Sequence, residues 1–247
     1  MGKRLEREYE IHYYDVDVKL KCRIESILNY FTDIGTKQSE SLGVGLEYML
    51  ERNLSWVFCK YDVKVKRYPR YGEKIKVSTK ALGFKKFYAS RAYEIHDCNG
   101  EKIVEAVGIF LLIDINRRRA VRIPSEQYDA YGVSEEGDNS IRVTKLDKVK
   151  EEMYSKSFKV GYSDIDSNKH VNNVNYTRWA LEAIPVEILY EYELSELSVV
   201  FEKECSYGEE IKSICEIKET EEGYFILHKI ENIEGKELAT LISKWKK

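Results

Sequence analysis

The chain has 247 residues, enough for one large domain or two small ones. Hydrophobic residues make up 43% and charged residues 34%, and the formal net charge is −3. This composition excludes a disordered chain and gives no sign of a nucleic-acid-binding or membrane-surface protein. Five scattered cysteines form no C-x-x-C pair, which argues against a zinc or redox motif and favours a reducing compartment.

The N-terminal stretch lacks the apolar core of a signal peptide, and it is too acidic and too poor in serine for a transit peptide. No apolar run approaches the roughly 20 residues that a membrane-spanning helix needs. We therefore expect a cytoplasmic protein.

The first half predicts an extended segment, one long helix and a series of antiparallel strands. Residues 6–16 alternate apolar and polar side chains. Helical spacing over 22–38 places six residues on one face: Ile24, Ile27, Leu28, Phe31, Ile34 and Gly35. A short helix is expected at GLEYMLERN, residues 45–53. Strand patterns then follow at 56–84 and 87–95, with a more buried strand at 108–115.

The same order of motifs occurs twice. YYDVD (13–17) resembles YSDID (162–166), RYGEKIKV (70–77) resembles SYGEEIKS (206–213), and CNGEKIVEAVGIFLLID (98–114) resembles IEGKELATLISKW (233–245). The first copy is 13 residues longer between the first two motifs, an insertion that we expect to hold the short helix.

The second helix carries Tyr176, Trp179, Ala180 and Ala183 on one face and should end at Pro185. The sequence thus predicts an α+β fold made of two units, each a long helix against a curved antiparallel sheet. We place the units at 1–131 and 153–247, joined by a linker at 132–152.

The most polar stretch, YSDIDSNKHVNNVNYTRW (162–179), precedes the second helix. Asp166, Asn168 and His170 alternate, so in an extended segment they share a face. Asn172 or Asn173 is the expected N-cap, and a helix N-terminus stabilises developing negative charge. A carboxylate, a histidine and an anion site together suit acyl hydrolysis.

A capped turn is the alternative, because Asp, Ser and Asn favour such positions for local hydrogen bonding alone. The repeat argues for the catalytic interpretation. The first copy has Lys19 where the second has Asn168, and Lys21 where it has His170. If a duplicated fold keeps a single active site, the polar catalytic side chains are expected in one copy and not in the other.

The stretch DIDSNKHVNNVNYTRWALEAIP resembles the D-x-N-x-H-V-N-N-x-x-Y signature of the acyl-acyl carrier protein thioesterases, the family of the plant fatty-acyl thioesterases and their bacterial relatives. VVFEKECSYGEE resembles the family segment in which a Glu-Cys pair follows basic residues. The resemblance covers nearly the whole chain and implies a tandem hot-dog fold. It also implies hydrolysis of fatty acyl-acyl carrier protein to free fatty acid, which ends chain elongation.

The resemblance also implies site residues. The catalytic positions of the family match Asp166, Asn168, His170 and Glu204, and Cys205 matches a cysteine once proposed as the nucleophile. Chain-length determinants would lie in the N-terminal half. Because the chain lacks transit-peptide features, the resemblance implies a bacterial member in the cytoplasm.

Two mechanisms remain open at this point. In the first, Glu204 and His170 activate a water, Asn168 holds the water or the thioester carbonyl, and amides at Asn172 and Asn173 bind the oxyanion. Asp166 then either orients His170 or attacks the carbonyl itself. In the second, Cys205, His170 and Asn168 form a nucleophilic triad, although neighbouring Glu204 disfavours a thiolate.

The acyl carrier protein (ACP) is acidic, so a basic face would dock it. The candidates are Lys64, Lys66, Arg67, Arg70, Lys85, Lys86, Arg117, Arg118, Arg119 and Arg122. The alternative functions are an acyl-CoA thioesterase and a non-hydrolytic hot-dog protein, either a dehydratase or an acyl-binding protein. We expect no metal, no cofactor, no nucleic-acid or membrane partner, and a monomer or homodimer.

Overall fold

A computed structural model describes residues 2–134, 141–166 and 169–247. The predicted site residue Asn168 lies outside them. The chain forms two compact units, one of residues 1–59 and 65–143 and one of residues 60–64 and 144–247.

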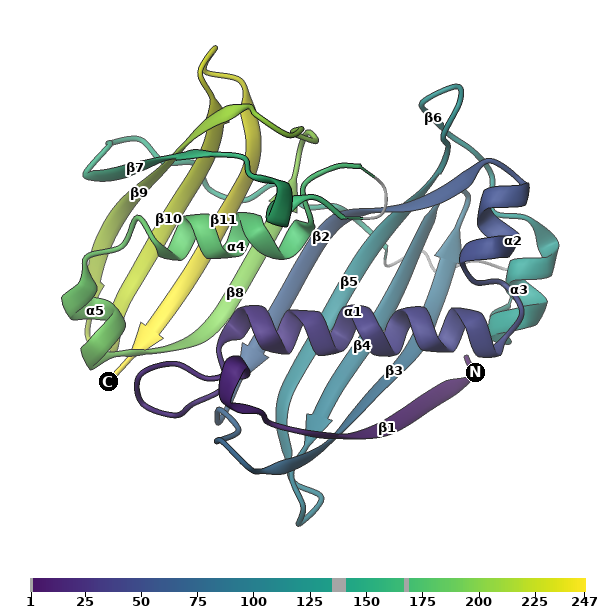
Figure 1. Ribbon diagram of the computed structural model, residues 1–247, viewed down its shortest axis with the longest axis horizontal. Helices are drawn as coiled ribbons and strands as arrows, with labels where there is room; N and C mark the ends of the chain where they lie inside the picture. The colour runs from purple at the N-terminus through teal and green to yellow at the C-terminus, as the bar shows by residue number, and fades with distance from the viewer. Residues whose placement is uncertain (1, 135–140, 167–168) are drawn as a thin grey trace. The chain divides into compact units, whose positions relative to one another are not determined.

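The first unit is an antiparallel sheet with one long helix across a face (Figure 1). The strands follow the order β1-β3-β4-β5-β2, and β6 pairs with β5. The elements are β1 (Arg4–Glu10), the 3₁₀ turn η1 (Tyr13–Asp15), α1 (Ile24–Ser41), α2 (Leu46–Glu51), β2 (Leu54–Val65), β3 (Lys74–Lys85), β4 (Tyr88–His96), β5 (Lys102–Asp114), β6 (Arg119–Ala120) and α3 (Ser125–Tyr131).

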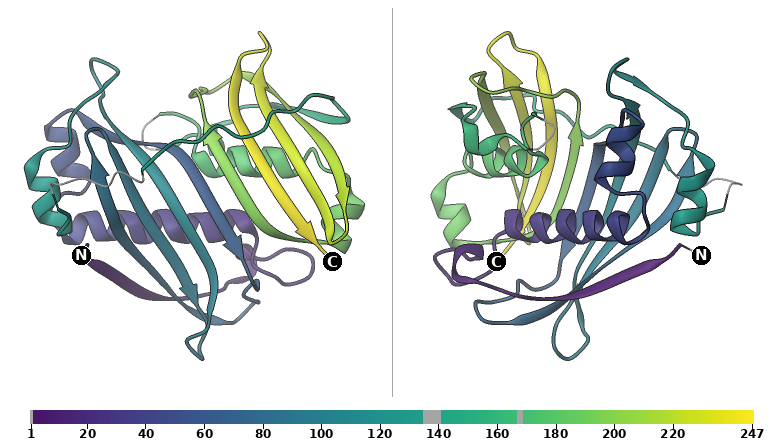
Figure 2. Two further views of the ribbon diagram at one scale, coloured as in Figure 1. Left: turned by 180° about the vertical axis from the view of Figure 1, so that it is seen from behind. Right: turned by 45° about the vertical axis from the view of Figure 1, so that its right-hand side comes forward.

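The second unit repeats this plan with the strand order β8-β11-β10-β9-β7. Its elements are β7 (Tyr154–Lys159), the 3₁₀ turn η2 (Tyr162–Asp164), α4 (Asn173–Leu181), α5 (Val186–Glu191), β8 (Glu193–Phe201), β9 (Glu210–Thr220), β10 (Gly223–Asn232) and β11 (Glu237–Lys246). Helix α4 lies on one face of this sheet, and residues 144–150 cross the other face (Figure 2).

The predicted helix faces are the buried ones. All six residues predicted for the face of α1 are buried, and in α4 Tyr176, Trp179 and Ala180 are buried. Burial of these apolar stripes against the sheets supplies most of the stability of both helices. No described helix is long and apolar enough to span a membrane.

The prediction for the end of the second helix was wrong. Helix α4 stops at Leu181, and Pro185 is instead the N-cap of the separate short helix α5. A proline fits there because its fixed φ suits the entrance of a helix and it needs no hydrogen-bond donor.

The placement of the insertion was also wrong. The short helix α2 has a counterpart of equal length, six residues, in α5. The extra residues of the first copy lie mainly in α1, which has 18 residues against nine in α4, and in β2, which has 12 against nine in β8. One more lies in the turn before β2.

Candidate active site

The predicted catalytic loop joins η2 to α4. The amide of Asp166 donates to the carbonyl of His170 over 2.9 Å, and the amide of Lys169 donates to the carbonyl of Asp166 over 3.0 Å. Lys169 has φ +65°, which lets the chain reverse, and Ile165 bridges to Val171. The loop therefore holds Asp166 and His170 at the base of one tight turn.

The loop sets His170 against a carboxylate from the end of the next strand. Its Nε2 lies 3.3 Å from Oε2 of Glu204, which follows β8. The two side chains are about one-third exposed, at 32% and 33%, so the pair is reachable by water and substrate. The structure thus brings together two of the four predicted catalytic residues, which are 34 positions apart in the sequence.

Tyr176 of α4 fixes the segment that carries Glu204. Its hydroxyl accepts the amide of Cys205 at 3.2 Å and lies 3.4 Å from both the carbonyl of Lys203 and the Cys205 thiol. The amide of Val171 donates to the carbonyl of Cys205 over 3.1 Å, which ties the catalytic loop to the same segment. Sequence reasoning assigned Tyr176 only to the apolar face of the helix, because a pattern cannot show where a hydroxyl points.

Cys205 is buried, with 1% of its surface exposed. Burial raises the pKa of its thiol to about 11, and the charges of Glu209 and Asp164 add to the rise. The hydrogen bond from Tyr176 opposes this shift without cancelling it. The thiol therefore stays protonated at neutral pH.

Helix α4 begins where the sequence predicted. Asn172 is the N-cap, and its side chain accepts the amide of Val174 at 3.0 Å. The amide of Asn175 donates to the carbonyl of Asn172 over 2.9 Å. Within the described residues this leaves the amide of Asn173 without an acceptor in the first turn of α4.

Asp164 is a buried carboxylate that sequence reasoning missed. Its side chain accepts the Gly161 amide at 2.8 Å and the Arg178 guanidinium at 2.5 Å. Its backbone carbonyl accepts the Asn172 amide at 2.9 Å and the Asn175 side chain at 3.0 Å. These contacts anchor the start of the catalytic loop to α4, and the repeated Asp of YYDVD and YSDID was the available signal.

The first unit has the same loop with different side chains. The amide of Asp17 donates to the carbonyl of Lys21 over 2.8 Å, Leu20 has φ +59°, and Val16 bridges to Cys22. The amide of Cys22 donates to the carbonyl of Pro69 over 2.8 Å, as that of Val171 does to Cys205.

Matching these hydrogen bonds places Lys21 where the second unit has His170, and Tyr68 where it has Glu204. Burial, together with the positive charges of Lys19 and Arg70, lowers the pKa of Lys21. The first unit therefore carries no histidine–carboxylate pair at the equivalent place.

The candidate docking residues differ in how firmly they are held. Arg67 pairs with Glu73 at 2.7 Å and with Asp97 at 3.3 Å, so it is engaged within its own unit. Arg117, Arg118 and Arg119 lie exposed between the end of β5 and the start of β6, and Nε of Arg117 lies 3.7 Å from Asp114. This turn presents the more accessible cluster of positive charge. No group of acids, histidines and cysteines suited to a metal occurs among the described residues.

The family models cover both halves of the chain. Residues 2–131 match the acyl-ACP thioesterase N-terminal domain, and residues 147–247 match the C-terminal domain. A chloroplastic acyl-[acyl-carrier-protein] hydrolase of Cuphea viscosissima is 28% identical over 99% of this chain and 63% of its own length. A palmitoyl-acyl carrier protein thioesterase of Cuphea hookeriana is 28% identical over 90% of this chain and 57% of its own length. The chain thus spans about six-tenths of the length of these curated relatives.

Solved structures agree in fold. A protein described as an oleoyl thioesterase from Lactobacillus plantarum has a TM-score of 0.91 at 22% identity, covering 99% of this chain and 96% of that one. The 12:0-ACP thioesterase of Umbellularia californica has a TM-score of 0.85 at 22% identity, covering 98% of this chain and 94% of that one.

The repeated helix-on-sheet units are therefore a tandem hot-dog fold, as predicted. With both family models matched, the chain belongs to the acyl-ACP thioesterase family.

Proposed function

We propose that this protein hydrolyses the thioester of fatty acyl-ACP, releases free fatty acid and so ends chain elongation. The observation that carries the proposal is the His170–Glu204 pair, 3.3 Å apart in the C-terminal unit of a chain of this family. The other unit has Lys21 and Tyr68 at the equivalent positions, so one reaction centre serves the two units.

Glu204 and His170 together position and deprotonate a water that attacks the thioester carbonyl. The histidine can accept the water proton near neutral pH and then return it to the leaving thiolate. The carboxylate orients the ring and stabilises the imidazolium that forms. Their partial exposure suits this role, because both water and the acyl thioester must reach them.

The oxyanion binds at the start of α4. Among the described residues the amide of Asn173 has no acceptor, and the helix dipole there favours negative charge. Asn168 would hold the water or the carbonyl. Asp166, held in the same loop, would either orient His170 or form a transient anhydride with the acyl group.

Cys205 serves as a buried structural residue in this proposal. A nucleophilic cysteine needs a thiolate, and a pKa of about 11 leaves almost none at neutral pH. Its thiol also faces the hydroxyl of Tyr176 in a buried contact.

The acyl chain is proposed to bind in the N-terminal unit. A cluster of buried apolar residues there joins α2, α3 and the sheet, and it includes Met49, Phe84 and Leu112. Half-buried Leu54, Trp56 and Phe110 pack against this cluster. Such side chains, with no buried charge among them, suit the walls of a fatty-acyl site. We place the enzyme in the cytoplasm with ACP as its partner.

The test is release of free thiol from a panel of acyl-ACP thioesters of rising chain length, beside the matching acyl-CoA thioesters. We expect His170→Ala and Glu204→Ala to lower kcat by at least about 100-fold, while Cys205→Ala keeps most activity. Loss of activity in Cys205→Ala with activity retained in Glu204→Ala would restore the cysteine triad. No release of thiol from any thioester by the wild type would refute the hydrolase proposal. Faster turnover of acyl-CoA than of acyl-ACP would identify CoA, and not ACP, as the carrier of the substrate.

A further inference from the structure

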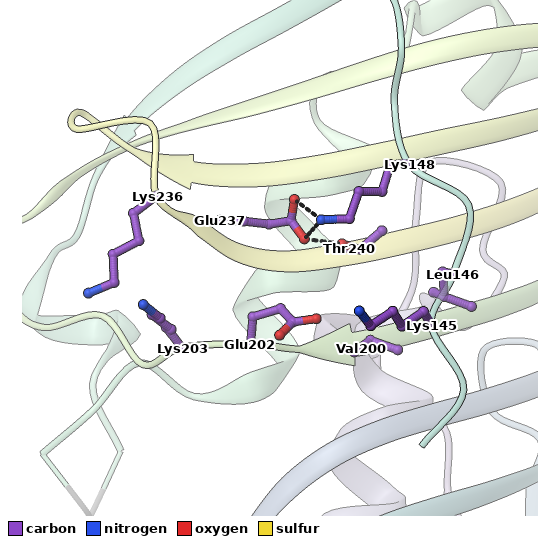
Figure 3. Close-up of a pocket in the computed structure, with 9 residues that line it drawn as sticks. All are labelled: Lys145, Leu146, Lys148, Val200, Glu202, Lys203, Lys236, Glu237 and Thr240. Carbon is purple, nitrogen blue, oxygen red and sulfur yellow. Dashed lines mark hydrogen bonds and ion pairs between the residues drawn. The ribbon is translucent and has the colours of Figure 1, made fainter. Parts of the chain in front are cut away.

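A cavity lies on the face of the second unit's sheet opposite α4. Its volume is about 290 Å³. It opens where residues 145–148 cross β8 and β11 (Figure 3). The lining residues are Lys145, Leu146, Lys148, Val200, Glu202, Lys203, Lys236, Glu237 and Thr240. Lysines outnumber carboxylates in this lining, so the cavity is positively charged.

Two of the lysines are placed for an anion. Lys148 is neutralised by Glu237, with Nζ 2.9 and 3.0 Å from the two carboxylate oxygens. Lys203 and Lys236 instead point their ammonium groups toward one another (Figure 3). Neither forms an ion pair with a carboxylate in the described part of the chain.

This arrangement is unfavourable when empty. Two like charges in proximity repel, and each loses part of its hydration. Desolvation and then the charge of Lys236 lower the pKa of Lys203, although Glu202 partly offsets them. A bound anion between the two ammonium groups would reverse that repulsion and accept hydrogen bonds from both.

The position of Lys203 links the cavity to the reaction centre. Lys203 immediately precedes Glu204, so their α-carbons are about 3.8 Å apart. Tyr176 holds the backbone on both sides of Glu204, through the carbonyl of Lys203 and the amide of Cys205. An anion held at Lys203 is therefore attached, through one hydrogen-bonded backbone segment, to the carboxylate that faces His170.

We propose that Lys203 and Lys236 bind the phosphate of the phosphopantetheine arm that carries the acyl thioester. The proposal rests on the proposed function, which requires a thioester of this kind. The arm bears its thiol at one end and a phosphate at the other, so a phosphate clamp outside the reaction centre would fix how far the thioester reaches. The same phosphate occurs in acyl-ACP and in acyl-CoA.

The test compares two small substrates that differ only in the phosphate, acyl-pantetheine and acyl-4′-phosphopantetheine. For the wild type we expect KM to be on the order of tenfold lower with the phosphate present. The ratio of KM for acyl-pantetheine to KM for acyl-4′-phosphopantetheine should fall toward one in Lys236→Ala. In Lys236→Glu the substrate with the phosphate should have the higher KM. Lys236 is exposed before β11, so these changes leave the fold intact.

Lys244→Ala is the matched control. Lys244 lies near the other end of β11 and pairs with Glu196 at 2.8 Å, so this variant should keep the wild-type ratio. An unchanged ratio in Lys236→Ala, or an equal loss in Lys244→Ala, overturns the proposal.

A second measurement separates this proposal from the proposed function. Calorimetry with free 4′-phosphopantetheine needs no catalysis, and we expect binding to the wild type that weakens on the order of tenfold in Lys236→Ala. Binding of 4′-phosphopantetheine without hydrolysis of any thioester would refute the hydrolase proposal and support the phosphate site. Hydrolysis by the wild type, together with equal binding of 4′-phosphopantetheine by the wild type and Lys236→Ala, would refute the phosphate site and leave the hydrolase proposal intact.

Discussion

At the scale of single residues, the two units differ in side chains while sharing a backbone. The same turn, with a left-handed residue at Leu20 or Lys169, presents Lys21 in one unit and His170 in the other. The residue opposite is Tyr68 or Glu204. A duplicated scaffold of this kind provides an internal control, because a structural residue can be changed in the unit without the histidine–carboxylate pair.

Asp164 and Asp15 are such a matched pair. Asp15 accepts the His12 amide at 2.9 Å and the Tyr30 hydroxyl at 2.7 Å, much as Asp164 accepts Gly161 and Arg178. Alanine at either position leaves buried donors unpaired, so each should cost about 1–3 kcal/mol in the free energy of unfolding. Only Asp164→Ala should also lower kcat, by about tenfold or more, because its loop carries His170.

Urea unfolding and thioester hydrolysis, measured on both variants, check this prediction. An equal fall in kcat for Asp15→Ala would show that loss of stability, and not displacement of the catalytic loop, accounts for the effect.

Tyr176→Phe tests the hold on Glu204. The variant removes the hydroxyl that satisfies the buried amide of Cys205, at a cost of about 1–3 kcal/mol. We expect kcat to fall while KM changes little, since Glu204 moves but the acyl site does not. Tyr30→Phe is the comparison, because its hydroxyl donates to buried Asp15 at 2.7 Å in the other unit. If both variants lower kcat alike, Tyr176 is only a stabilising residue.

At the scale of elements, strands β10 and β11 share a buried polar contact inside an apolar core. Nε2 of His228 lies 2.8 Å from Oγ of Ser243, which also accepts the Trp245 indole at 2.9 Å. His228 is fully buried, and burial lowers its pKa to about 3, from an ordinary value near 6.5. The folded state therefore binds the proton less readily than the unfolded state does.

The sign of the pH effect follows from that difference. The contribution of neutral His228 to stability is fully present above about pH 6.5 and is lost as the pH falls toward 3. The loss is up to about 1.4 kcal/mol per pH unit in that window. In His228→Gln, unfolding should depend less on pH between 6 and about 4. Parallel pH dependence of the two proteins, measured by denaturant unfolding, would contradict the burial of this histidine.

At the scale of the whole molecule, the net charge of −3 means that attraction of the proposed acidic carrier would come from a local cluster. The turn of Arg117, Arg118 and Arg119 is exposed, whereas Arg67 is held in ion pairs. Arg119→Glu should therefore lower kcat/KM for acyl-ACP by several-fold at low salt and leave acyl-pantetheine unaffected.

The effect of Arg119→Glu should shrink as ionic strength rises, because a Debye length of about 8 Å at physiological salt screens exposed charges. Lys244→Glu supplies a charge reversal on the other unit. A fall of equal size in that variant would mean that overall charge, rather than this turn, governs association.

The sequence by itself determined the duplication, the buried faces of both helices, and an N-cap at Asn172 or Asn173. Each depends on local periodicity or on repeated motifs, which a linear pattern contains in full. The sequence also suggested His170 and Glu204 as partners, through the family motif rather than through their spacing, and the structure places them 3.3 Å apart. His170 and Glu204 are 34 positions apart in the sequence, so they come into contact only once β8 has paired with its neighbouring strands.

The tertiary structure decided what depends on direction and burial. It showed that α2 has a counterpart in α5. The extra residues of the first copy lengthen α1 and β2 instead, and a linear comparison of the two copies cannot show which elements take up an insertion. It turned Tyr176 from an apolar-face residue into the hydrogen-bond partner of the Glu204 segment. It buried Cys205 and thereby raised its pKa, since desolvation is a property of packing that no run of neighbouring residues encodes.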